Sequence, residues 1–408
     1  MTSFLGGPET QLTSNEVRDL ITTYFSTLDL DGRSLCLVVP DATRVCPLPL
    51  LLGAIIDAVD GRVSSCVVLV ALGTHAPMSD AARRDLVGIS ELTTMNHEWW
   101  NDDTFVTIGT LDSDRVAELS EGRLTMDVPV RINRLILESD VVVTVGPVLP
   151  HEVAGFSGGD KYLFPGVSGP EMIDVSHWLG ALVTSREIIG TRGVTPVRAL
   201  IHAAADLVPG ERHALCVVGD HDGGLRFVAV GDSRETWAAA ADVAAVTHIR
   251  YLDEPVKRVV SLVPTRYQDL WTGAKGFYKV EPIVADGGQV IIVAPHIHEL
   301  ASTHPGLAEI GYHCRDWFLA HWDRYCDRPW GELAHSTHLF GAGTFDAQDG
   351  EQQRVTVTLA TGIGEELVRR VNLDYLDPNA VDLDELMADP GTLVVPDAGE
   401  VLYRLRRH

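Results

Sequence analysis

The chain has 408 residues, with 57 Asp or Glu against 32 Lys or Arg, which gives a formal net charge of −25 at pH 7. Such a negative balance argues against DNA, RNA and anionic membranes as partners, because proteins bind phosphate groups largely through Lys and Arg. A hydrophobic content of 45% excludes a disordered chain. The length predicts two or three domains of roughly 100 to 200 residues each.

The six cysteines show no tight pairing pattern, which predicts reduced thiols in a cytoplasmic protein. The N-terminal segment has neither a basic region nor an apolar stretch of signal-peptide length. The longest apolar stretches, at 64–73 and 141–146, are far shorter than the roughly 20 residues of a membrane-spanning helix. We therefore expect a protein that is neither exported nor anchored in a membrane.

Short apolar runs rich in Val, Ile and Leu predict strands that are buried on both faces of a parallel sheet. They lie at Ser34–Pro40, Ser64–Ala71, Asp140–Val145, Ala214–Val218, Arg258–Val263 and Gln289–Ala294. Amphipathic segments of helical length alternate with them at Leu48–Val59, Ser79–Val87, Pro196–Leu207, Ser233–Val246, Gly306–Ile310 and Gly364–Asn372. This alternation predicts an α/β fold with mainly parallel sheets.

Four of the predicted strands run into polar or charged residues. These are Asp41-Ala-Thr-Arg44, then Thr74-His75, then His151, and last Arg266 to Asp269 with Lys275 shortly after. Ligands of open α/β sheets bind outside the carboxyl ends of the strands. Although any single loop is expected to be polar, four such loops predict a common site.

The densest motif is Pro150-His-Glu-Val-Ala-Gly-Phe-Ser-Gly-Gly-Asp-Lys-Tyr-Leu-Phe-Pro-Gly166. It differs from the phosphate loop GxxxxGK[ST], because its spacing is different and Tyr162 replaces the Ser or Thr that would hold magnesium. Its glycines would let the backbone approach a bound group closely. Lys161 could contact a phosphate or form a covalent attachment. The alternative is a mobile surface loop with an incidental lysine, against which the apolar residues of the motif argue.

Three histidines accompany this motif, namely His151 within it, His177 in a predicted helix after it, and His97 in Asn96-His-Glu-Trp-Trp100. Neutral imidazole is the commonest metal ligand and is well suited to proton transfer near pH 7. A lone histidine is more often structural. Together with Lys161, the three histidines indicate a site with acid/base groups, a lysine-anchored group and a candidate metal ligand.

These segments together resemble the lactate racemase family, and the resemblance continues through Asp269–Gly276 and Val394–Gly399 over nearly the whole chain. That family uses a nickel-pincer nucleotide, pyridinium-3-thioamide-5-thiocarboxylic acid mononucleotide, covalently bound through a lysine, with nickel held by an S–C–S pincer and a histidine. The resemblance implies an isomerase that racemises or epimerises a 2-hydroxy acid. Hydride would leave the α carbon reversibly, through a 2-keto acid.

The resemblance also implies which residues meet the cofactor. Lys161 resembles the attachment lysine, and His177 resembles the protein ligand of nickel. Further cofactor contacts are expected at Asp41, Thr43, Phe156, Ser157, Pro165 and Gly166.

Substrate roles follow in the same way. His97 and His151 resemble a pair of acid/base residues, one for each enantiomer, which suits a reversible inversion. Arg44 and Lys275 resemble groups that clamp the substrate carboxylate, and Trp271–Thr272 would shape the substrate wall. The expected partners are a small anionic 2-hydroxy acid and the enzymes that mature the cofactor.

The predicted domains are residues 1–255 together with 388–408, which would hold the cofactor, and residues 256–387, which would cover the substrate. The boundary lies at the charged turn near Tyr251–Val256, and a strand near Leu393–Val395 is expected to return to the first domain. The active site is predicted in the cleft between the two domains.

Three positions depart from the family pattern. Asp160 stands where an arginine often precedes the attachment lysine, Trp271–Thr272 replaces a Tyr-Gln pair, and Thr195 stands where an asparagine is common. These changes alter the charge beside the cofactor and the substrate wall. They leave open a substrate other than lactate, and His75 remains near the site without a role.

Alternative functions also remain open. The first is an epimerase of a longer acid, an aldonate or an aryl-lactate, and the second is a non-catalytic cofactor carrier or substrate sensor. A nicotinamide dehydrogenase would need a GxGxxG motif after the first strand, which is absent from the sequence. The last alternative is a zinc site, but a helical core with surface histidines is the better interpretation of this segment. The spacing of the candidate ligands matches no CxxC-type pattern. Those residues are Cys314, Cys326, His313, His321, His335 and His338.

Overall fold

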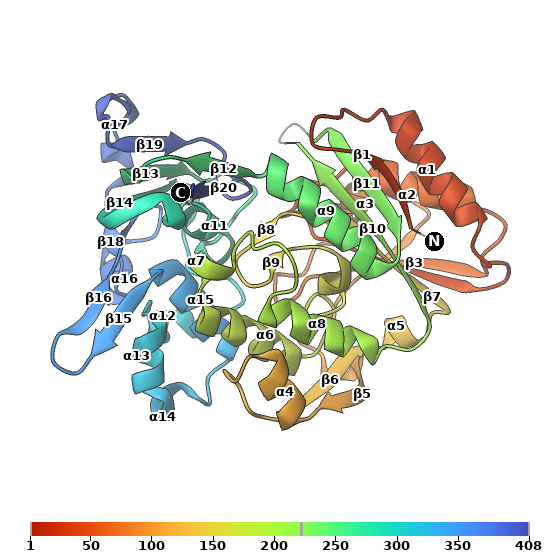
Figure 1. The fold of residues 1–408 in the computed structure, drawn as a ribbon, viewed down its shortest axis with the longest axis horizontal. Helices are drawn as coiled ribbons and strands as arrows, with labels where there is room; N and C mark the ends of the chain where they lie inside the picture. The colour runs from red at the N-terminus through yellow and green to blue at the C-terminus, as the bar shows by residue number, and fades with distance from the viewer. Residues whose placement is uncertain (1, 221–222, 407–408) are drawn as a thin grey trace. The chain divides into compact units, whose positions relative to one another are not determined.

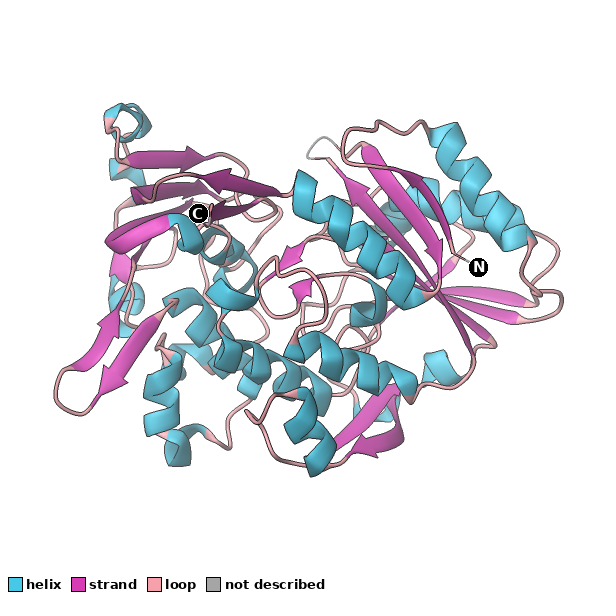
Figure 2. Ribbon diagram, in the orientation of Figure 1, coloured by secondary structure: helices cyan, strands magenta, loops and turns pink. Residues whose placement is uncertain are grey.

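The computed structural model describes residues 2–220 and 223–406. The chain folds into two compact units, and each contains both strands and helices (Figure 1, Figure 2). Unit 1 comprises Met1–Leu149, Phe156–Ser176 and Arg192–Thr247, and unit 2 comprises Pro150–Gly155, His177–Thr191 and His248–His408. The chain thus passes from one unit to the other several times, and its last passage lies close to the charged turn that begins at Tyr251.

The main sheet of unit 1 has the strand order β1-β11-β10-β7-β2-β3-β4 (Figure 1). The strands are Ser3–Gly6 (β1), Leu225–Gly231 (β11), Glu211–Gly219 (β10), Val141–Pro147 (β7), Ser34–Val39 (β2), Ser65–Val70 (β3) and Thr93–Asn96 (β4). Neighbouring strands from β10 to β4 are parallel, whereas β11 is antiparallel to both β10 and β1. Four predicted strands form the parallel centre, so the expected sheet type is confirmed.

Helices cover both faces of this sheet, because its central strands alternate between two apolar sides. Leu215 and Val217 of β10 share a core with α1 and α2. The intervening Cys216 contacts Thr236 of α9 on the other face. The helices of unit 1 are Ser14–Ser26 (α1), Leu48–Val59 (α2), Asp80–Val87 (α3), Ser113–Leu119 (α4), Arg134–Leu137 (α5), Pro196–Asp206 (α8) and Ser233–Thr247 (α9). Phe105–Leu111 (β5) and Val128–Asn133 (β6) form an antiparallel pair.

The sheet of unit 2 has the order β18-β17-β14-β13-β19, with all neighbours parallel. Its strands are Asp374–Tyr375 (β18), Thr356–Thr361 (β17), Val284–Ala294 (β14), Val256–Leu262 (β13) and Thr392–Val395 (β19). Helices that carry residues discussed below are Ser185–Ile188 (α7), Leu270–Gly273 (α10), Lys275–Tyr278 (α11), Arg315–Ala320 (α13), Trp322–Tyr325 (α14), Trp330–Phe340 (α15) and Leu383–Ala388 (α17). Pro170–Val183 (α6) begins in unit 1 and ends in unit 2. Both units are therefore α/β, as predicted.

The C-terminal strand differs from the expectation. β19 is present where a strand was predicted near Leu393–Val395, but it pairs with β13 in the sheet of unit 2 and does not return to the first sheet. Val394 packs against the small core of Val260, Ile291 and Ala360, which explains this pairing. Leu402–Leu405 (β20) then pairs with Ile249–Leu252 (β12), also in unit 2. Across residues 2–220 and 223–406, no helix combines the length and apolar character needed to cross a bilayer.

Candidate active site

The loop that carries Lys161 is built around two left-handed glycines. Gly158 and Gly159 have φ angles of 85° and 60°, which residues with a Cβ rarely adopt. A Cβ on Gly158 would lie 2.6 Å from the side chain of Val148, and one on Gly166 would lie 2.3 Å from the carbonyl oxygen of Tyr162. A side chain at either position would therefore collide with neighbouring protein atoms, and the approach of this backbone to a bound group stays a prediction.

Asp41 stabilises the loop after β2 through hydrogen bonds that its carboxylate accepts. Its Oδ1 accepts hydrogen bonds from the backbone N–H of Thr43 at 3.1 Å and from the Thr43 hydroxyl at 2.6 Å. Its Oδ2 lies 2.5 Å from Nδ1 of His75. Burial by itself would raise the pKa of Asp41, but His75, Thr43 and the charge of Arg44 outweigh it and lower that pKa. Asp41 is therefore an ionised brace between two loops.

Three segments of unit 1 meet at this brace. His75 follows β3 and Asp41 follows β2, so their contact joins the ends of two neighbouring strands. The N–H of Gly73 donates to the carbonyl oxygen of Gly166 at 3.0 Å, which ties the same region to the segment after Lys161. The predicted convergence of strand ends is confirmed for two of the four loops, those after β2 and β3.

His97 is completely buried in unit 1. Its Nε2 lies 3.2 Å from the carbonyl oxygen of Ser168, and its Nδ1 lies 3.1 Å from the side-chain amide of Asn133. Since a carbonyl only accepts, Nε2 carries the proton and Nδ1 accepts from the amide. Burial lowers the pKa of His97 to about 4. His97 is thus neutral at pH 7, and a substrate could exchange a proton with it only after one of these hydrogen bonds opens.

His151 belongs to unit 2 and is also buried. Its Nδ1 accepts a hydrogen bond from the N–H of Val153 at 3.1 Å, and the carboxylate of Glu152 lies 3.6 Å from the same nitrogen. When the ring is neutral, its proton therefore sits on Nε2.

His177 lies on the part of α6 that belongs to unit 2 and is half-buried. The next residue, Trp178, anchors the helix by stacking on Trp322 of α14 at 5.3 Å between ring centroids. Burial lowers the pKa of His338 on α15 to about 4. Glu152 and His177 both lie within electrostatic range of His338.

Trp271 forms a rigid wall in unit 2. Its ring is stacked between the imidazoles of His304 and His335, at centroid distances of 3.9 and 4.3 Å. His335 also donates from Nε2 to the carbonyl oxygen of Trp271 at 3.1 Å, since a carbonyl only accepts. Burial lowers the pKa of His335 to about 3, so its ring is neutral at pH 7. Both faces of the indole are covered, so a substrate can meet only its edge.

Thr272 and Lys275 follow in the short helices α10 and α11. The Thr272 hydroxyl donates to the carboxylate of Asp269 at 2.7 Å, and Asp269 also caps α10. The buried Lys275 ammonium donates to the carbonyl oxygen of Thr272 at 3.4 Å and lies 5.2 Å from the ring centroid of Tyr267. Three predicted substrate residues are thus neighbours, and the Thr272 hydroxyl turns toward its own helix cap.

Arg198 was missed by the sequence reasoning, although it contacts the lysine loop. Its side chain is completely buried and donates to the carbonyl oxygen of Gly158 at 3.1 Å. Thr195 begins the same helix and accepts a hydrogen bond from the N–H of Arg198 at 3.1 Å, so threonine performs the capping that asparagine would perform. The sequence offered one signal for this role, namely an arginine in the first turn of α8, three residues after its N-cap Thr195.

Two histidines of the zinc alternative are engaged in other contacts. His313 lies 2.8 Å from the carboxylate of Glu351 and stacks on Trp317 at 3.6 Å between centroids. His335 packs on Trp271. Within the part of the chain that the structure describes, no three His, Cys, Asp or Glu side chains are grouped as a metal ion would require.

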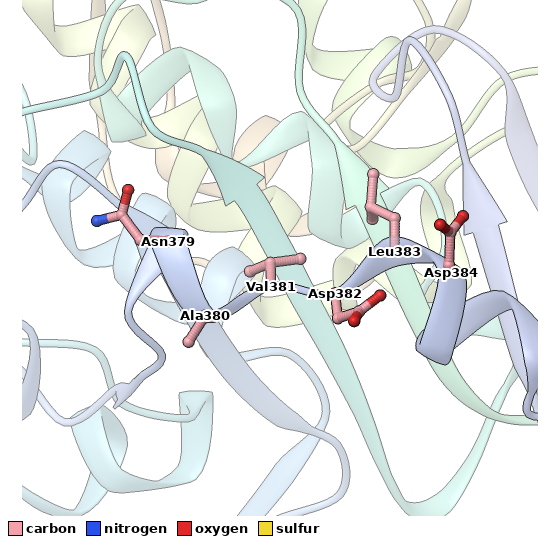
Figure 3. Close-up of a pocket in the computed structure, with 6 residues that line it drawn as sticks. All are labelled: Asn379, Ala380, Val381, Asp382, Leu383 and Asp384. Atoms are coloured by element: carbon pink, nitrogen blue, oxygen red, sulfur yellow. The ribbon is translucent and has the colours of Figure 1, made fainter.

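Two cavities lie in unit 2. A hollow of about 510 Å³ runs along Asn379–Asp384, a single exposed segment that contains none of the predicted site residues (Figure 3). A second cavity of about 390 Å³ lies beside α7 and the end of α15. Its lining includes Ser185 and His338, whose side-chain polar atoms have no hydrogen-bond partner among the described residues. The second cavity therefore borders the α15 residue on which His177 acts.

Comparison with known proteins identifies related chains. Residues 20–190 match the family described as the lactate racemase N-terminal domain. A lactate racemase from Thermoanaerobacterium thermosaccharolyticum is 26% identical over 287 residues, which are 67% of this chain and 62% of that protein. A lactate racemase from Lactiplantibacillus plantarum is 26% identical over 272 residues, or 64% of this chain and 60% of that protein. The matches thus span less than two thirds of the length of these relatives.

Solved structures extend the likeness to the whole chain. A crystal structure of a protein from Thermotoga maritima has a TM-score of 0.91 and 30% identity, and the match covers 98% of this chain and all of that one. The lactate racemase apoprotein from Thermoanaerobacterium thermosaccharolyticum has the same fold, with a TM-score of 0.75, 18% identity, and coverage of 97% of this chain and 94% of that one. On these matches, residues 20–190 form a lactate racemase N-terminal domain, and the chain shares the fold of a lactate racemase over nearly its whole length.

Proposed function

We propose that this protein racemises or epimerises a 2-hydroxy acid with a nickel-pincer nucleotide attached to Lys161. The observation that carries the proposal is the placement of Lys161 in the loop formed by Gly158 and Gly159, two residues after the second glycine. Its loop is tied through Gly166 to the strand-end loops that hold Asp41 and His75. The relatives named lactate racemase support a hydroxy acid as the substrate class.

The residues present fit such a cofactor. Lys161 supplies the primary amine for attachment, and His177 supplies an imidazole, which suits nickel as a ligand. Because the described residues contain no metal-binding cluster of their own, a metal at His177 would need its other ligands from a bound group. When bound, the nucleotide supplies the acceptor and donor of hydride.

The protein's own task is to move the hydroxyl proton of the substrate. We assign this task to His151 and His97, each acting on one enantiomer. His151 holds Nδ1 in a hydrogen bond to the N–H of Val153 and has Glu152 beside it. Because the neutral ring carries its proton on Nε2, His151 can take up the hydroxyl proton only at Nδ1, after the hydrogen bond from Val153 has opened. His97 needs the bond to Ser168 or Asn133 to open first.

The substrate carboxylate is assigned to Arg44 and Lys275. Lys275 is a buried ammonium whose partners include a carbonyl oxygen and the face of Tyr267. An incoming carboxylate would be a stronger partner in such a low-dielectric setting. The same two cations would also hold the 2-keto acid, which retains its carboxylate, until hydride returns.

The covered faces of Trp271 favour an aliphatic substrate over an aryl-lactate. An aryl ring gains from stacking on an indole face, but His304 and His335 already occupy both faces. Among longer acids, an aldonate therefore suits this wall better than an aryl-lactate does. We keep the aldonate as the second candidate substrate.

The decisive experiment is co-expression with the cofactor-maturation enzymes, followed by intact-mass analysis and chiral assays of enantiopure lactate, an aldonate and an aryl-lactate. We expect an adduct on the Lys161 peptide, bound nickel and turnover of a hydroxy acid. Lys161→Arg keeps the positive charge and should lose both adduct and turnover. A loaded protein that turns over no hydroxy acid would favour the carrier or sensor, and stoichiometric NADH formation would favour a dehydrogenase.

A further inference from the structure

A buried arginine holds the lysine loop from the side of α8 and α9. The guanidinium of Arg198 donates to the carbonyl oxygens of Phe156 and Gly158, the latter at 3.1 Å. Its Cζ lies 4.2 Å from the ring centroid of Trp237, and the indole N–H of Trp237 donates to the carbonyl oxygen of Ser157 at 3.0 Å. Three consecutive carbonyl groups of the loop are thus bound by two side chains from neighbouring helices.

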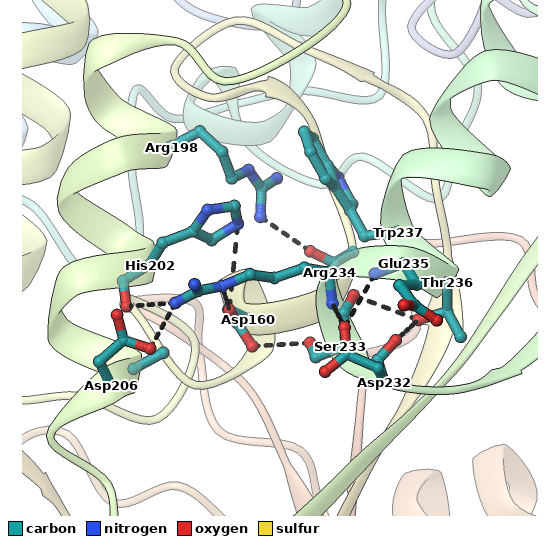
Figure 4. A network of polar contacts seen from close by, with 12 residues as sticks. Asp160, Arg198, His202, Asp206, Asp232, Ser233, Arg234, Glu235, Thr236 and Trp237 are labelled. Atoms are coloured by element: carbon teal, nitrogen blue, oxygen red, sulfur yellow. Dashed lines mark hydrogen bonds and ion pairs between the residues drawn. The ribbon is translucent and has the colours of Figure 1, made fainter. Parts of the chain in front are cut away.

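The charge of this arginine is balanced from within the loop. Burial lowers the pKa of Arg198 to about 10, and the carboxylate of Asp160 is the first group that raises it. Asp160 is itself buried, and its Oδ1 accepts a hydrogen bond from the hydroxyl of Ser233 at 2.6 Å. Its Oδ2 lies 3.9 Å from both His202 and Arg234 (Figure 4). Asp160 is therefore oriented by α8 and α9, although it lies next to Lys161 in the sequence.

This arrangement explains why an aspartate, and not the arginine common in the family, suits position 160. An isolated buried guanidinium is strongly destabilising, and an arginine at position 160 would add a second positive charge beside it. A carboxylate at the same position neutralises Arg198. Since Arg198 is completely buried, it cannot itself reach a bound phosphate or substrate, and it acts through the loop that it holds.

We propose that Arg198 and Asp160 are positioning residues for Lys161. Arg198 binds the carbonyl oxygens of Phe156 and Gly158, the charge of Asp160 offsets that of Arg198, and the loop so held presents the Lys161 amine in one orientation for cofactor attachment. The inference rests on the proposed function for its purpose, but the ordering of the loop can be measured on the protein without its cofactor.

The first experiment therefore uses the unloaded protein. Arg198→Met removes both hydrogen bonds and the charge, while Arg198→Lys keeps only the charge. We expect amide hydrogen exchange over residues 156–162 to accelerate by about tenfold or more in Arg198→Met, as for a segment that has lost its anchoring bonds. Modification of Lys161 by an amine-reactive acetylating reagent, read by peptide mass spectrometry, should change in parallel. Arg192→Met, which removes an exposed Arg192–Asp242 pair on the surface of the same unit, should leave both readings unchanged.

A double variant separates positioning from general stability. Asp160→Asn alone leaves Arg198 without its counter-charge and should lower the melting temperature. Arg198→Met combined with Asp160→Asn removes both charges and should recover much of that stability, because neutral replacement of a buried pair is often tolerated. The fraction of Lys161 that carries the adduct after co-expression should stay low in the double variant, since the carbonyl groups remain unheld.

Two results would overturn the inference. One is an Arg198→Met protein with the exchange rates and Lys161 reactivity of the wild type. The other is a double variant that recovers adduct formation together with stability, which would make the pair merely structural. If the wild type gains no adduct while the exchange and labelling changes occur as expected, the proposed cofactor is wrong and the ordering of the loop still stands.

Discussion

Nδ1 of His75 lies 2.5 Å from Oδ2 of Asp41, and this single contact joins the ends of β2 and β3. The other oxygen of Asp41 is bound to Thr43, so both carboxylate oxygens are engaged. The contact gives His75 a role that its place in the sequence did not reveal. It orients the loop that carries Arg44, which we propose as a carboxylate clamp.

Asp41→Asn should therefore loosen two loops at once. The amide can replace only part of the hydrogen bonding that the carboxylate forms with His75 and Thr43, so we expect a loss of about 1–3 kcal/mol in the free energy of unfolding. Urea denaturation measures this loss. Asp57→Asn, which removes an exposed partner of Arg18, is the matched control. An Asp41→Asn protein as stable as that control would refute the bracing role.

The buried histidines predict a pH dependence of stability. Burial lowers the pKa of His97 from 6.5 to about 4, so the unfolded chain takes up a proton there that the folded chain refuses. Stability from this residue is fully present above pH 6.5 and is lost as the pH falls toward 4. A tenfold difference in proton affinity between the folded and unfolded chains corresponds to about 1.4 kcal/mol, so the lowered pKa of His97 accounts for about 3 kcal/mol of stability.

His97→Gln isolates this effect from that of the acidic residues. The glutamine amide can replace both hydrogen bonds to Ser168 and Asn133 without titrating. Unfolding curves at a series of pH values should show a shallower loss of stability between pH 6.5 and 4 in the variant than in the wild type. Parallel curves for the two proteins would contradict the assignment of a neutral, buried His97.

Trp271 is expected to limit the length of the substrate. Because His304 and His335 hold the indole by both faces, its edge cannot move aside for a longer chain. Trp271→Leu should therefore raise kcat/KM for an aldonate relative to lactate in the cofactor-loaded enzyme. Trp100→Leu, at a half-exposed position, is the control, and an unchanged ratio in Trp271→Leu would remove this residue from the substrate wall.

Much of the fold could be predicted, because its central strands are continuous apolar runs. The runs that became β2, β3 and β7 have no charged side chain on either face that could suggest another structure. The antiparallel strand β1 was missed, since its four residues alternate between half-buried and exposed and resemble an ordinary terminus. The pairing of β19 with β13 was missed because a short apolar strand does not reveal its neighbour.

The sequence could predict site residues that belong to a motif or follow a strand. It could not predict residues whose role depends on contacts with distant parts of the chain. The contact of Asp41 with His75 agrees with the rule that strand ends converge. In the sequence, by contrast, Arg198 looks like part of the polar face of an amphipathic helix. Only the folded chain shows that it is buried against the loop of Gly158, which lies forty residues earlier in the sequence. The covered faces of Trp271 likewise depend on two histidines that are distant in the sequence.

The net charge of −25 leads to the last prediction, because the proposed substrate is also an anion. The field of the whole protein disfavours its approach, while Arg44 and Lys275 would attract it at short range, where screening by salt is weak. Added salt should therefore weaken the repulsion more than the attraction, and the apparent KM of the loaded enzyme should stay constant or fall between low and physiological ionic strength.

Arg44→Gln completes this test. Loss of one charge-assisted hydrogen-bonding partner of a carboxylate, worth about 1.5–3 kcal/mol, should raise KM by roughly ten- to a hundredfold and leave the adduct on Lys161 intact. Arg18→Gln, a partly exposed arginine of α1, should leave KM unchanged. A steep rise of KM with salt in the wild type would contradict the prediction. It would mean that long-range attraction dominates substrate binding, and that short-range contacts with Arg44 and Lys275 do not.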